Sequence, residues 1–501
     1  MTTTKVFYDR AACIFLLIVL ALALRLTRLN LPFFEPYNSI GRQAVGASVA
    51  RNFYQHGFNF FYPEINENGA GPSLFNLEMP FAAYLAAIGY ALAGGVREWV
   101  ARGVSVLFSM GTLIILYFLT KRLYDKRTAL ATLLFAAVSP LHLALSRAVQ
   151  PEEILIFAST GTLAAYYFYQ ETRKKRFFIL SALCLFVAIG SKLYSLYLFI
   201  PLLFLGLRVE GKKIFRDPKN YAYLAVSLSA GLWWLAMWRA GQTQELAYSS
   251  YHYAVHRAGE GMSYWRVLFH WPYVKILSKV FLVHILTPLG IIFFLAGLLQ
   301  RVKTKADAFV QIWFWSVVLF MLVFLRAAIQ HSYYQAPFIP ACAILVGKGA
   351  RRLFAHASVG RLLRNRLTLT LILICEMASL LYFYRGLYFI PPKFYSILEA
   401  GSAVERLTPK DSLVVASHGT SAIQLYYTDR KGWSFGLVPE PGETLIGSFE
   451  KLRKKGAAYF VASSREELDR VPEFLEYLRG RYAVVEEKPG YLLFKLNGWE
   501  T

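Results

Sequence analysis

Long apolar runs, separated by short and mostly basic gaps, fill the first four-fifths of this chain. They cover roughly residues 11–28, 98–119, 128–145, 152–169, 177–190, 193–208, 221–239, 277–299, 308–325, 335–352 and 367–385. A helix that crosses a bilayer needs about 20 predominantly apolar residues, and most of these runs approach that length. The pattern predicts a mainly α, polytopic helical membrane protein with about 11 transmembrane helices.

The charge balance raises a second question, because the 501-residue chain carries a formal net charge of +23 while 56% of its residues are hydrophobic. A soluble protein cannot bury that much apolar surface. The excess of Lys and Arg fits either a nucleic-acid face or cytoplasmic loops that obey the positive-inside rule. The basic residues cluster in the gaps between apolar runs, which favours the loops. We therefore expect membrane lipid, and no nucleic acid, as a partner.

The apolar run 79–94 decides the topology, because it is shorter than the length that a spanning helix needs and because its crossing would invert every later loop. If it crosses the membrane, the basic loop 120–127 falls on the same side as the acidic stretch before it. If it does not cross, the basic loops 120–127, 170–176, 208–220, 300–307 and 348–366 all share the cytoplasmic side with the N-terminus. We therefore predict a non-spanning helix at 79–94, a multi-pass protein of the cell membrane, a cytoplasmic N-terminus and an extracytoplasmic C-terminus.

The N-terminus and the cysteines give two further expectations. Lys5 and Arg10 precede the first apolar run, but no small-residue cleavage site follows, so we expect an uncleaved first helix. The four cysteines all lie in apolar runs, which suggests neither a disulfide framework nor a zinc site.

Residues 29–78 form the longest polar segment between apolar runs, and the predicted topology places them on the outer face. Apolar residues recur at helical spacing between Ala44 and Phe53, with Arg42 and Arg51 among the polar positions between them. That pattern is typical of an amphipathic helix along a membrane surface. We expect this first outer loop, with its interfacial helices, to form the roof of an active site within a transmembrane catalytic domain of residues 1–395.

The composition changes from about residue 400. Short buried strands are predicted at 412–416, 458–462, 483–486 and 491–496, and helical spacing at 444–455 and 465–481. This indicates a small α/β extracytoplasmic domain over residues 400–501. It has no nucleophile elbow, phosphate loop or metal-ligand spacing, so we expect a cap or a docking domain.

Ionisable residues gather at the outer ends of the apolar runs, where a membrane protein normally avoids charge. Singly, each has an ordinary explanation: an acid at a helix start partners the helix dipole, and a Lys or Arg near a helix end snorkels to the interface. The alternation of acids and cations along one face favours a site instead. The candidates are Glu35, Arg42, Glu78, Arg147, Glu152, Glu153, Lys192, Arg326, His331 and Tyr334.

Carboxylates beside cations suit a substrate made of a phosphate on a lipid tail. Phosphate oxygens attract Lys and Arg, and a carboxylate can take a proton from an incoming hydroxyl. Sugar transfer from a polyprenyl phosphate needs both functions, and one displacement at the anomeric carbon inverts its configuration. The sequence is compatible with this chemistry without requiring it.

Four segments resemble motifs of the GT-C superfamily of membrane glycosyltransferases, in the branch (family 39 type) that contains protein O-mannosyltransferases and bacterial aminoarabinose transferases. They are PYNSIGRQAVGASVARNFY at 36–54, NLEMPFAAYL at 76–85, SRAVQPEEILIF at 146–157 and QHSYYQAPFIPACAILVGKG at 330–349. They occur in the family's order and cover about 350 N-terminal residues. The resemblance implies a GT-C fold and an inverting transferase that moves a hexosyl or pentosyl group from a polyprenyl-phosphate sugar to a lipid, glycan or protein acceptor.

The resemblance also implies roles for particular residues. The catalytic acid of the first loop, usually Asp, falls on Glu35, although Tyr37 stands nearer the position of the acid in some relatives. Glu152 matches the acid of the second outer loop, with Arg147 upstream, and Glu78 matches the Glu before Pro. The remaining expected contacts to the carrier phosphate and sugar are Arg42, Lys192, Arg326, His331 and Tyr334. Some relatives use a divalent metal and others do not, and the sequence does not choose.

Three other functions compete with a transferase. A transporter or flippase of lipid-linked sugars would carry polar residues in the middles of several helices, whereas here they concentrate in outer loops. An oligosaccharyltransferase would need Trp-Trp-Asp-Tyr-Gly, but Trp233-Trp234 continues as Leu-Ala-Met within an apolar run. A non-catalytic scaffold around the C-terminal domain is the third alternative.

Overall fold

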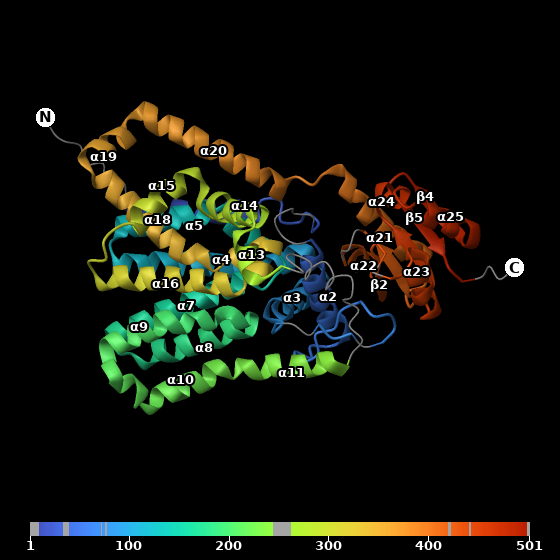
Figure 1. Cartoon of the computed structure of the whole chain (residues 1–501), viewed down its shortest axis with the longest axis horizontal. Helices are drawn as coiled ribbons and strands as arrows, with labels where there is room; N and C mark the ends of the chain where they lie inside the picture. Colours follow the sequence, from blue (N-terminus) through green and yellow to red (C-terminus); the bar gives the residue numbers. More distant parts are fainter. Residues whose placement is uncertain are drawn as a thin grey trace. The chain divides into compact units, whose positions relative to one another are not determined.

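The computed structural model of the chain describes residues 10–33, 40–71, 73–75, 78–243, 262–418, 422–439 and 442–497. The chain divides into two compact units (Figure 1). Unit 1 consists of Met1–Asn30, Arg102–Leu235 and Met262–Tyr388, and unit 2 consists of Leu31–Ala101, Ala236–Gly261 and Phe389–Thr501. Unit 2 therefore joins the first outer loop to the C-terminal domain, two segments that the sequence analysis assigns to different domains.

Unit 1 is a bundle of helices, and each predicted apolar run lies on one of them or on two or three that follow one another. In chain order they are α1 (Arg10–Leu26), α4 (Glu98–Leu123), α5 (Lys126–Val138), α6 (Pro140–Leu145), α7 (Glu152–Thr172), α8 (Lys175–Ser191), η1 (Leu193–Leu198), α9 (Phe199–Glu210), η2 (Gly211–Phe215), α10 (Pro218–Leu228), α11 (Ala230–Thr243), α13 (Tyr264–Phe269), α14 (Trp271–Lys279), η3 (Val280–Leu286), α15 (Thr287–Leu298), α16 (Lys305–Val323), α17 (Leu325–Gln330), η4 (Ser332–Gln335), α18 (Phe338–Ala355), α19 (Ala357–Arg364) and α20 (Arg366–Tyr388).

Among the described residues, five helical segments are long and apolar enough to cross a membrane. They are Glu98–Leu123, Leu193–Phe215, Trp271–Leu298, Lys305–Val323 and Thr370–Tyr388. The chain is a multi-pass membrane protein, while the count of eleven crossings stays a prediction. One predicted run is interrupted where α5 ends before Ser139, because Pro140 opens α6 and cannot continue the preceding helix.

Glycines allow close helix contacts in unit 1. A methyl group on Gly297 of α15 would overlap the Leu345 carbonyl of α18, and one on Gly349 would overlap the Phe293 carbonyl. Without side chains at these positions, the two backbones pack against each other directly, as small residues permit between membrane helices.

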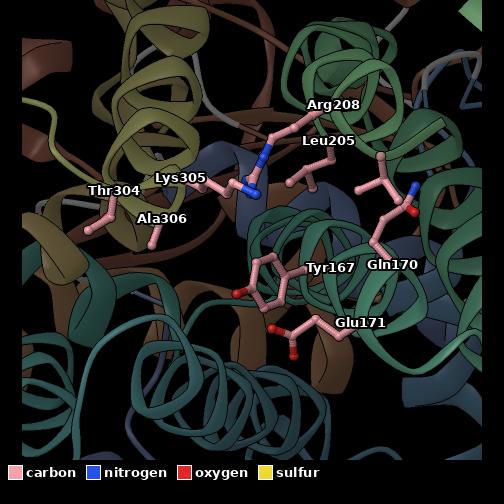
Figure 2. A pocket seen from close by; sticks show the side chains of 9 residues that line it. Tyr167, Gln170, Glu171, Leu205, Arg208, Thr304, Lys305 and Ala306 are labelled. Carbon is pink, nitrogen blue, oxygen red and sulfur yellow. The ribbon is translucent and has the colours of Figure 1, made fainter. Parts of the chain in front are cut away.

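At one end of α7, unit 1 contains an open cavity of about 490 Å³ between α7, α9 and the start of α16 (Figure 2). It lies at the C-terminal end of α7, whereas Glu152 begins that helix. The helix rise of about 1.5 Å per residue therefore separates the cavity from Glu152 by roughly 25 Å.

Unit 2 is built on a five-stranded sheet in the order β2-β1-β3-β5-β4. The strand β1 runs parallel to β2 and β3, and β5 runs antiparallel to β3 and β4. The strands are β1 (Val414–Ser417), β2 (Gly432–Ser434), β3 (Tyr459–Ala462), β4 (Ala483–Lys488) and β5 (Tyr491–Lys495). The helices are α2 (Ile40–His56), α3 (Phe81–Ala93), η5 (Pro392–Phe394), α21 (Tyr395–Leu407), α22 (Ile423–Thr428), α23 (Leu445–Lys454), α24 (Arg465–Asp469) and α25 (Pro472–Arg481).

Alternating residues of the buried strands supply the two cores of the sheet, since successive side chains point to opposite faces. Val415 packs with Phe449 of α23 and Phe474 of α25 on one face. Val414 packs with Val404 of α21 and Leu425 of α22 on the other. The small α/β domain predicted from the sequence is thus a sheet covered by helices on both faces.

The first outer loop continues this sheet beyond β2. Glu67 forms a parallel bridge with Gly432. The Gly432 amide donates to the Asn66 carbonyl (2.9 Å), and the Gly69 amide donates to the Gly432 carbonyl (3.0 Å). The exposed edge that a short strand would otherwise leave is thereby paired.

Candidate functional site

The turn between α6 and α7 delivers two acids to the start of a buried helix. Pro151 precedes the first turn of α7, where its missing amide costs nothing, and Glu152 and Glu153 occupy that turn. Both glutamates are fully buried. The positive end of the helix dipole favours carboxylates here, but burial of two adjacent acids still calls for charged or polar partners.

Glu152 faces Lys192. The Lys192 Nζ lies 3.7 Å from the Glu152 Oε1, and both side chains are almost completely buried. Lys192 follows the last residue of α8 in extended conformation, and its amide still donates to the Ala188 carbonyl (2.9 Å). The end of α8 therefore fixes the backbone from which this lysine reaches the glutamate.

Aromatic rings surround the lysine. The Lys192 Nζ lies 6.0 Å from the centre of the Tyr333 ring, a distance at which the ring face attracts a cation. Tyr333 stacks on His331 and on Tyr334, with ring centres 4.9 and 5.3 Å away. Tyr194 lies 5.7 Å from Tyr334. The structure thus brings four predicted site residues, Glu152, Lys192, His331 and Tyr334, into one cluster, with Tyr194 and Tyr333 added.

Glu152 has an unusual environment for a buried carboxylate. Within the described part of the chain, neither of its oxygens accepts a hydrogen bond. Buried polar atoms nearly always have such a partner, and an exception calls for a ligand, a water or an ion. The ammonium group of Lys192 balances its charge but lies beyond hydrogen-bond distance.

Arg147 is buried, and three of its hydrogen bonds go to the end of α1. Its Nη1 donates to the carbonyls of Arg25 (2.8 Å) and Thr27 (2.5 Å), and its Nη2 donates to that of Arg28 (3.1 Å). Arg28 has a φ of 52°, a left-handed conformation that needs support in a non-glycine residue. These contacts make Arg147 an anchor for the chain where it leaves the first helix.

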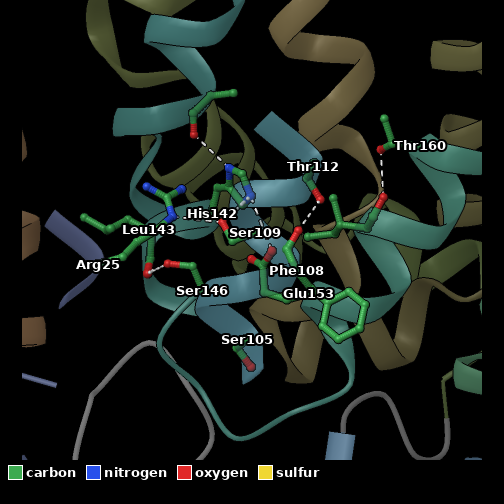
Figure 3. A network of polar contacts seen from close by, with 12 residues as sticks. Arg25, Ser105, Phe108, Ser109, Thr112, His142, Leu143, Ser146, Glu153 and Thr160 are labelled. Carbon is green, nitrogen blue, oxygen red and sulfur yellow. Dashed lines mark hydrogen bonds and ion pairs between the residues drawn. The ribbon is translucent and has the colours of Figure 1, made fainter. Parts of the chain in front are cut away.

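A buried polar network lies beside Glu153 (Figure 3). The Glu153 Oε2 is 3.4 Å from the His142 Nε2, and this nitrogen is 3.1 Å from the Ser109 hydroxyl. The Arg25 Nε donates to the same hydroxyl (2.9 Å). The His142 Nδ1 donates to the Ala136 carbonyl (2.7 Å), which places a proton on that nitrogen.

This network joins α1, α4, α6 and α7 around the residue next to Glu152. Three of its members, Arg25, Ser109 and His142, are not among the residues predicted from the sequence, and they lie inside or at the end of apolar runs. Arg25 and His142 could have been identified from the sequence, because an ionisable residue within an apolar run is a functional or structural candidate by default. The network's physical effect is to fix the first turn of α7, and so to position Glu152.

Arg326 lies apart from these contacts. It is an exposed residue of α17, and its Nη2 donates to the Met262 carbonyl (2.8 Å). A contact between Arg326 and the carrier phosphate therefore stays a prediction.

The remaining predicted residues belong to unit 2. Arg42 of α2 forms a buried ion pair with Glu78, and its guanidinium lies 5.0 Å from the centre of the Phe75 ring. Each of these charges compensates the burial of the other. Glu35 and Tyr37 lie outside the described residues.

The helix α2 is more buried than its amphipathic pattern suggests, because its polar side chains also have protein partners. The Arg51 Nη1 donates to the Asp429 carboxylate (2.7 Å) and to the Tyr426 carbonyl (3.0 Å). Its guanidinium lies 4.1 Å from the centre of the Tyr426 ring. The first outer loop is thereby fastened to α22 of the C-terminal domain.

Glu67 is a strongly perturbed acid of unit 2. Burial raises its pKa from 4.5 to about 7, although the hydrogen bond from the Ser434 hydroxyl (2.7 Å) opposes the rise. Its neighbour Glu64 binds Lys431 (2.6 Å). No group of three His, Cys, Asp or Glu side chains within the described ranges is arranged to hold a metal ion.

Comparison with known proteins gives the fold a context. Residues 78–236 match the family model of dolichyl-phosphate-mannose-protein mannosyltransferases. A search of curated proteins finds no match.

Solved structures match nearly the whole chain. Two are crystal structures of ArnT from Cupriavidus metallidurans, in the apo state and bound to undecaprenyl phosphate, with TM-scores of 0.67 and 0.66. Each is 16% identical and covers 97% of this chain and 98% of ArnT. A third is the oligosaccharyltransferase AglB from Archaeoglobus fulgidus with an inhibitory peptide and a dolichol-phosphate. It has a TM-score of 0.57 at 11% identity, over 99% of this chain and 75% of AglB. The chain therefore has the GT-C fold of membrane glycosyltransferases, as the resemblance of its motifs predicts.

Proposed function

We propose that the chain is a membrane glycosyltransferase that moves a sugar from a polyprenyl-phosphate carrier to an acceptor. The observation that carries the proposal is the buried Glu152, whose carboxylate oxygens accept no hydrogen bond within the described part of the chain, beside Lys192 and a group of aromatic rings. These two residues suit a ligand that carries a phosphate and a hydroxyl group. The lysine attracts the phosphate, and a carboxylate that accepts no other hydrogen bond can accept one from the hydroxyl.

In the proposed reaction, Lys192 binds the carrier phosphate. The oxygen of the acceptor hydroxyl attacks the anomeric carbon of the donor sugar, and the bond between that carbon and the phosphate oxygen breaks. The electron pair of this bond leaves with the polyprenyl phosphate, whose developing charge the ammonium group stabilises. A carboxylate, Glu152 or Glu35, takes the proton of the hydroxyl, and the configuration of the sugar inverts.

The other predicted residues receive supporting roles. Tyr334 and His331 line the sugar subsite beside Lys192. Arg42, Glu78 and Arg326 stay proposed contacts to the substrates, on the resemblance of their motifs. Arg147 stays a proposed neighbour of the carrier phosphate that also anchors α1.

The carrier is proposed from chemistry and from relatives. ArnT from Cupriavidus metallidurans has been solved with undecaprenyl phosphate, and AglB from Archaeoglobus fulgidus with a dolichol-phosphate. We infer the same class of carrier here, with a hexosyl or pentosyl group as cargo and transfer at the outer face of the cell membrane. The proposed orientation has the N-terminus in the cytoplasm and the C-terminal domain outside.

The test is a transfer assay with the purified full chain, labelled polyprenyl-phosphate sugars and acceptor membranes. We expect Glu152→Gln and Lys192→Gln each to lower the transfer rate by about a hundredfold or more. Glu210→Gln, an acid paired with Arg173 and Lys219 near the far end of the bundle, serves as the matched control and should retain the wild-type rate. Equal transfer by all variants would remove Glu152 and Lys192 from the mechanism.

A further inference from the structure

The cavity at the C-terminal end of α7 plays no part in the proposed transfer, yet its lining is distinctive. The helix α7 contributes Tyr167, Gln170 and Glu171, α9 contributes Leu205, Arg208 and Val209, and the start of α16 contributes Thr304, Lys305 and Ala306. Its volume of about 490 Å³ is in the range of small-molecule sites in proteins.

The acids around this end of the bundle already have basic partners. Glu171 binds the Arg122 Nε (2.5 Å), and Glu210 binds the Arg173 Nη1 (2.9 Å) and the Lys219 Nζ (3.2 Å). The same holds for Asp125 with Arg351, for Asp217 with Lys219 and for Asp307 with Lys348. Negative charge in these loops is thus locally compensated.

Two basic residues, Arg208 and Lys305, line the cavity. Arg208 and Lys305 form no ion pair with any carboxylate in the part of the chain that the structure describes. Figure 2 shows their side chains reaching toward one another across the cavity, with Tyr167 beside them. Two cations that converge without an anion repel each other. An anion bound between Arg208 and Lys305 is attracted to both side chains and so offsets their mutual repulsion.

The start of α16 adds to the positive potential. Thr304 and Asp307 form a reciprocal capping box, which satisfies the amides of these two residues. The amides of Lys305 and Ala306 belong to the same first turn, whose donors have no acceptor within the helix. Both residues line the cavity, and the positive end of the helix dipole there also favours an anion.

We propose that this cavity binds a phosphate group, held between Arg208 and Lys305. Its apolar lining by Leu205, Val209 and Ala306 and the exposed Leu203 and Leu207 of the adjoining α9 surface suit the headgroup of an anionic phospholipid. A soluble phosphate ester offers the same charge. On the predicted topology the site faces the cytoplasm, away from Glu152, and it is independent of the transfer reaction.

The experiment measures lipid binding to the full chain by native mass spectrometry, with phosphatidylglycerol and phosphatidylcholine as probes. The cavity variant is Arg208→Gln/Lys305→Gln. The matched control is Arg301→Gln/Lys303→Gln, which removes the same charge from two exposed residues of the neighbouring loop that do not line the cavity. We expect wild type and control to prefer phosphatidylglycerol, and the cavity variant to bind it about tenfold more weakly.

A second arm separates the two sources of phosphate. Glycerol 3-phosphate is titrated against bound phosphatidylglycerol, and displacement that requires Arg208 and Lys305 assigns the site to soluble esters as well. The single variant Lys305→Gln changes only an exposed position, so it keeps the test valid if the double variant misfolds. It should bind phosphatidylglycerol about threefold more weakly than wild type. The proposal is overturned if the cavity variant binds both probes as the control does, or if phosphatidylcholine binds as tightly as phosphatidylglycerol.

Discussion

Arg147 has two candidate roles, one as a contact to the substrate and one as an anchor for the end of α1. Its motif resembles a substrate-binding arginine, whereas its described hydrogen bonds hold three carbonyls at the end of α1. An arginine serves this purpose better than a lysine because its planar fork donates to several acceptors at once.

The first prediction follows from those contacts. Arg147→Met should lower the free energy of unfolding by about 3 kcal/mol, because one buried carbonyl and two partly buried carbonyls lose a charged donor. Arg147→Lys should recover only part of the loss. Thermal unfolding of the purified chain measures both. A variant Arg147→Met with the wild-type midpoint and no carrier binding would instead assign the residue to the phosphate.

Glu67 gives a prediction of pH dependence. Its folded pKa of about 7 lies above its ordinary value of 4.5, so the folded state holds the proton more tightly than the unfolded chain. The stability of unit 2 should therefore be highest below about pH 4.5 and should fall as the pH rises to about 7, by up to about 3 kcal/mol.

Glu67→Gln keeps an acceptor for Ser434 but cannot ionise, so it should abolish this fall and make unit 2 more stable than wild type at pH 8. Hydrogen exchange of the peptide around Gly432, corrected for intrinsic rates, reports the effect at pH 5 and pH 8. The same pH response in wild type and variant would show that Glu67 does not titrate in this range.

At the scale of elements, the helices are the part of the fold that sequence predicts best. Apolar runs determine which segments become membrane helices, and all the predicted runs coincide with helices in the structure. The pairing of these helices depends on glycines such as Gly349, whose importance becomes visible only when two backbones are placed side by side.

Gly349→Ala should therefore destabilise the bundle by several kcal/mol, because a methyl group there collides with the Phe293 carbonyl of α15. Gly103→Ala in α4 is the control, since a methyl group there meets no atom within 4 Å and alanine favours a helix more than glycine does. Thermal midpoints in detergent should fall for the first variant and stay or rise for the second. Equal midpoints would mean that α15 and α18 are not packed this tightly.

The elements of unit 2 show where sequence reasoning stops. The strand β2 contains only Gly432, Trp433 and Ser434, too short for an alternating pattern to be recognised. Some partners of α2, such as Asp429 for Arg51, lie more than 370 positions away in the chain. Local periodicity predicts an amphipathic helix, but it cannot say that protein rather than water covers the polar side.

The individual residues of the candidate site could be predicted from the sequence, but their arrangement could not. Glu152, Lys192, His331 and Tyr334 carried the signal of charged or aromatic residues at the ends of apolar runs. Their convergence depends on three separate parts of the chain, namely the start of α7, the end of α8 and the junction of α17 with η4. It also depends on a network through Arg25, Ser109 and His142, which no local pattern contains. Glu35, the other predicted acid, lies outside the described residues, so its role stays a prediction.

At the scale of the whole molecule, the basic loops predict the orientation in the membrane. Single cysteines at Asn59 and Lys212, both exposed, in a chain whose four cysteines are replaced by serine, should react with an impermeant reagent from opposite sides of intact cells. Asn59→Cys should label from outside and Lys212→Cys only after permeabilisation. Labelling of both from the same side would contradict the predicted topology and place the run 79–94 across the membrane.

The account as a whole rests on a carrier phosphate held by Lys192. The most direct measurement is equilibrium binding of a radiolabelled polyprenyl phosphate to the purified chain, compared with the uncharged polyprenol. We predict that wild type and Lys219→Gln bind the phosphate at least about tenfold more tightly than the alcohol, and that Lys192→Gln loses this preference. Equal affinity of wild type for the phosphate and the alcohol, or an unchanged preference in Lys192→Gln, would contradict the account.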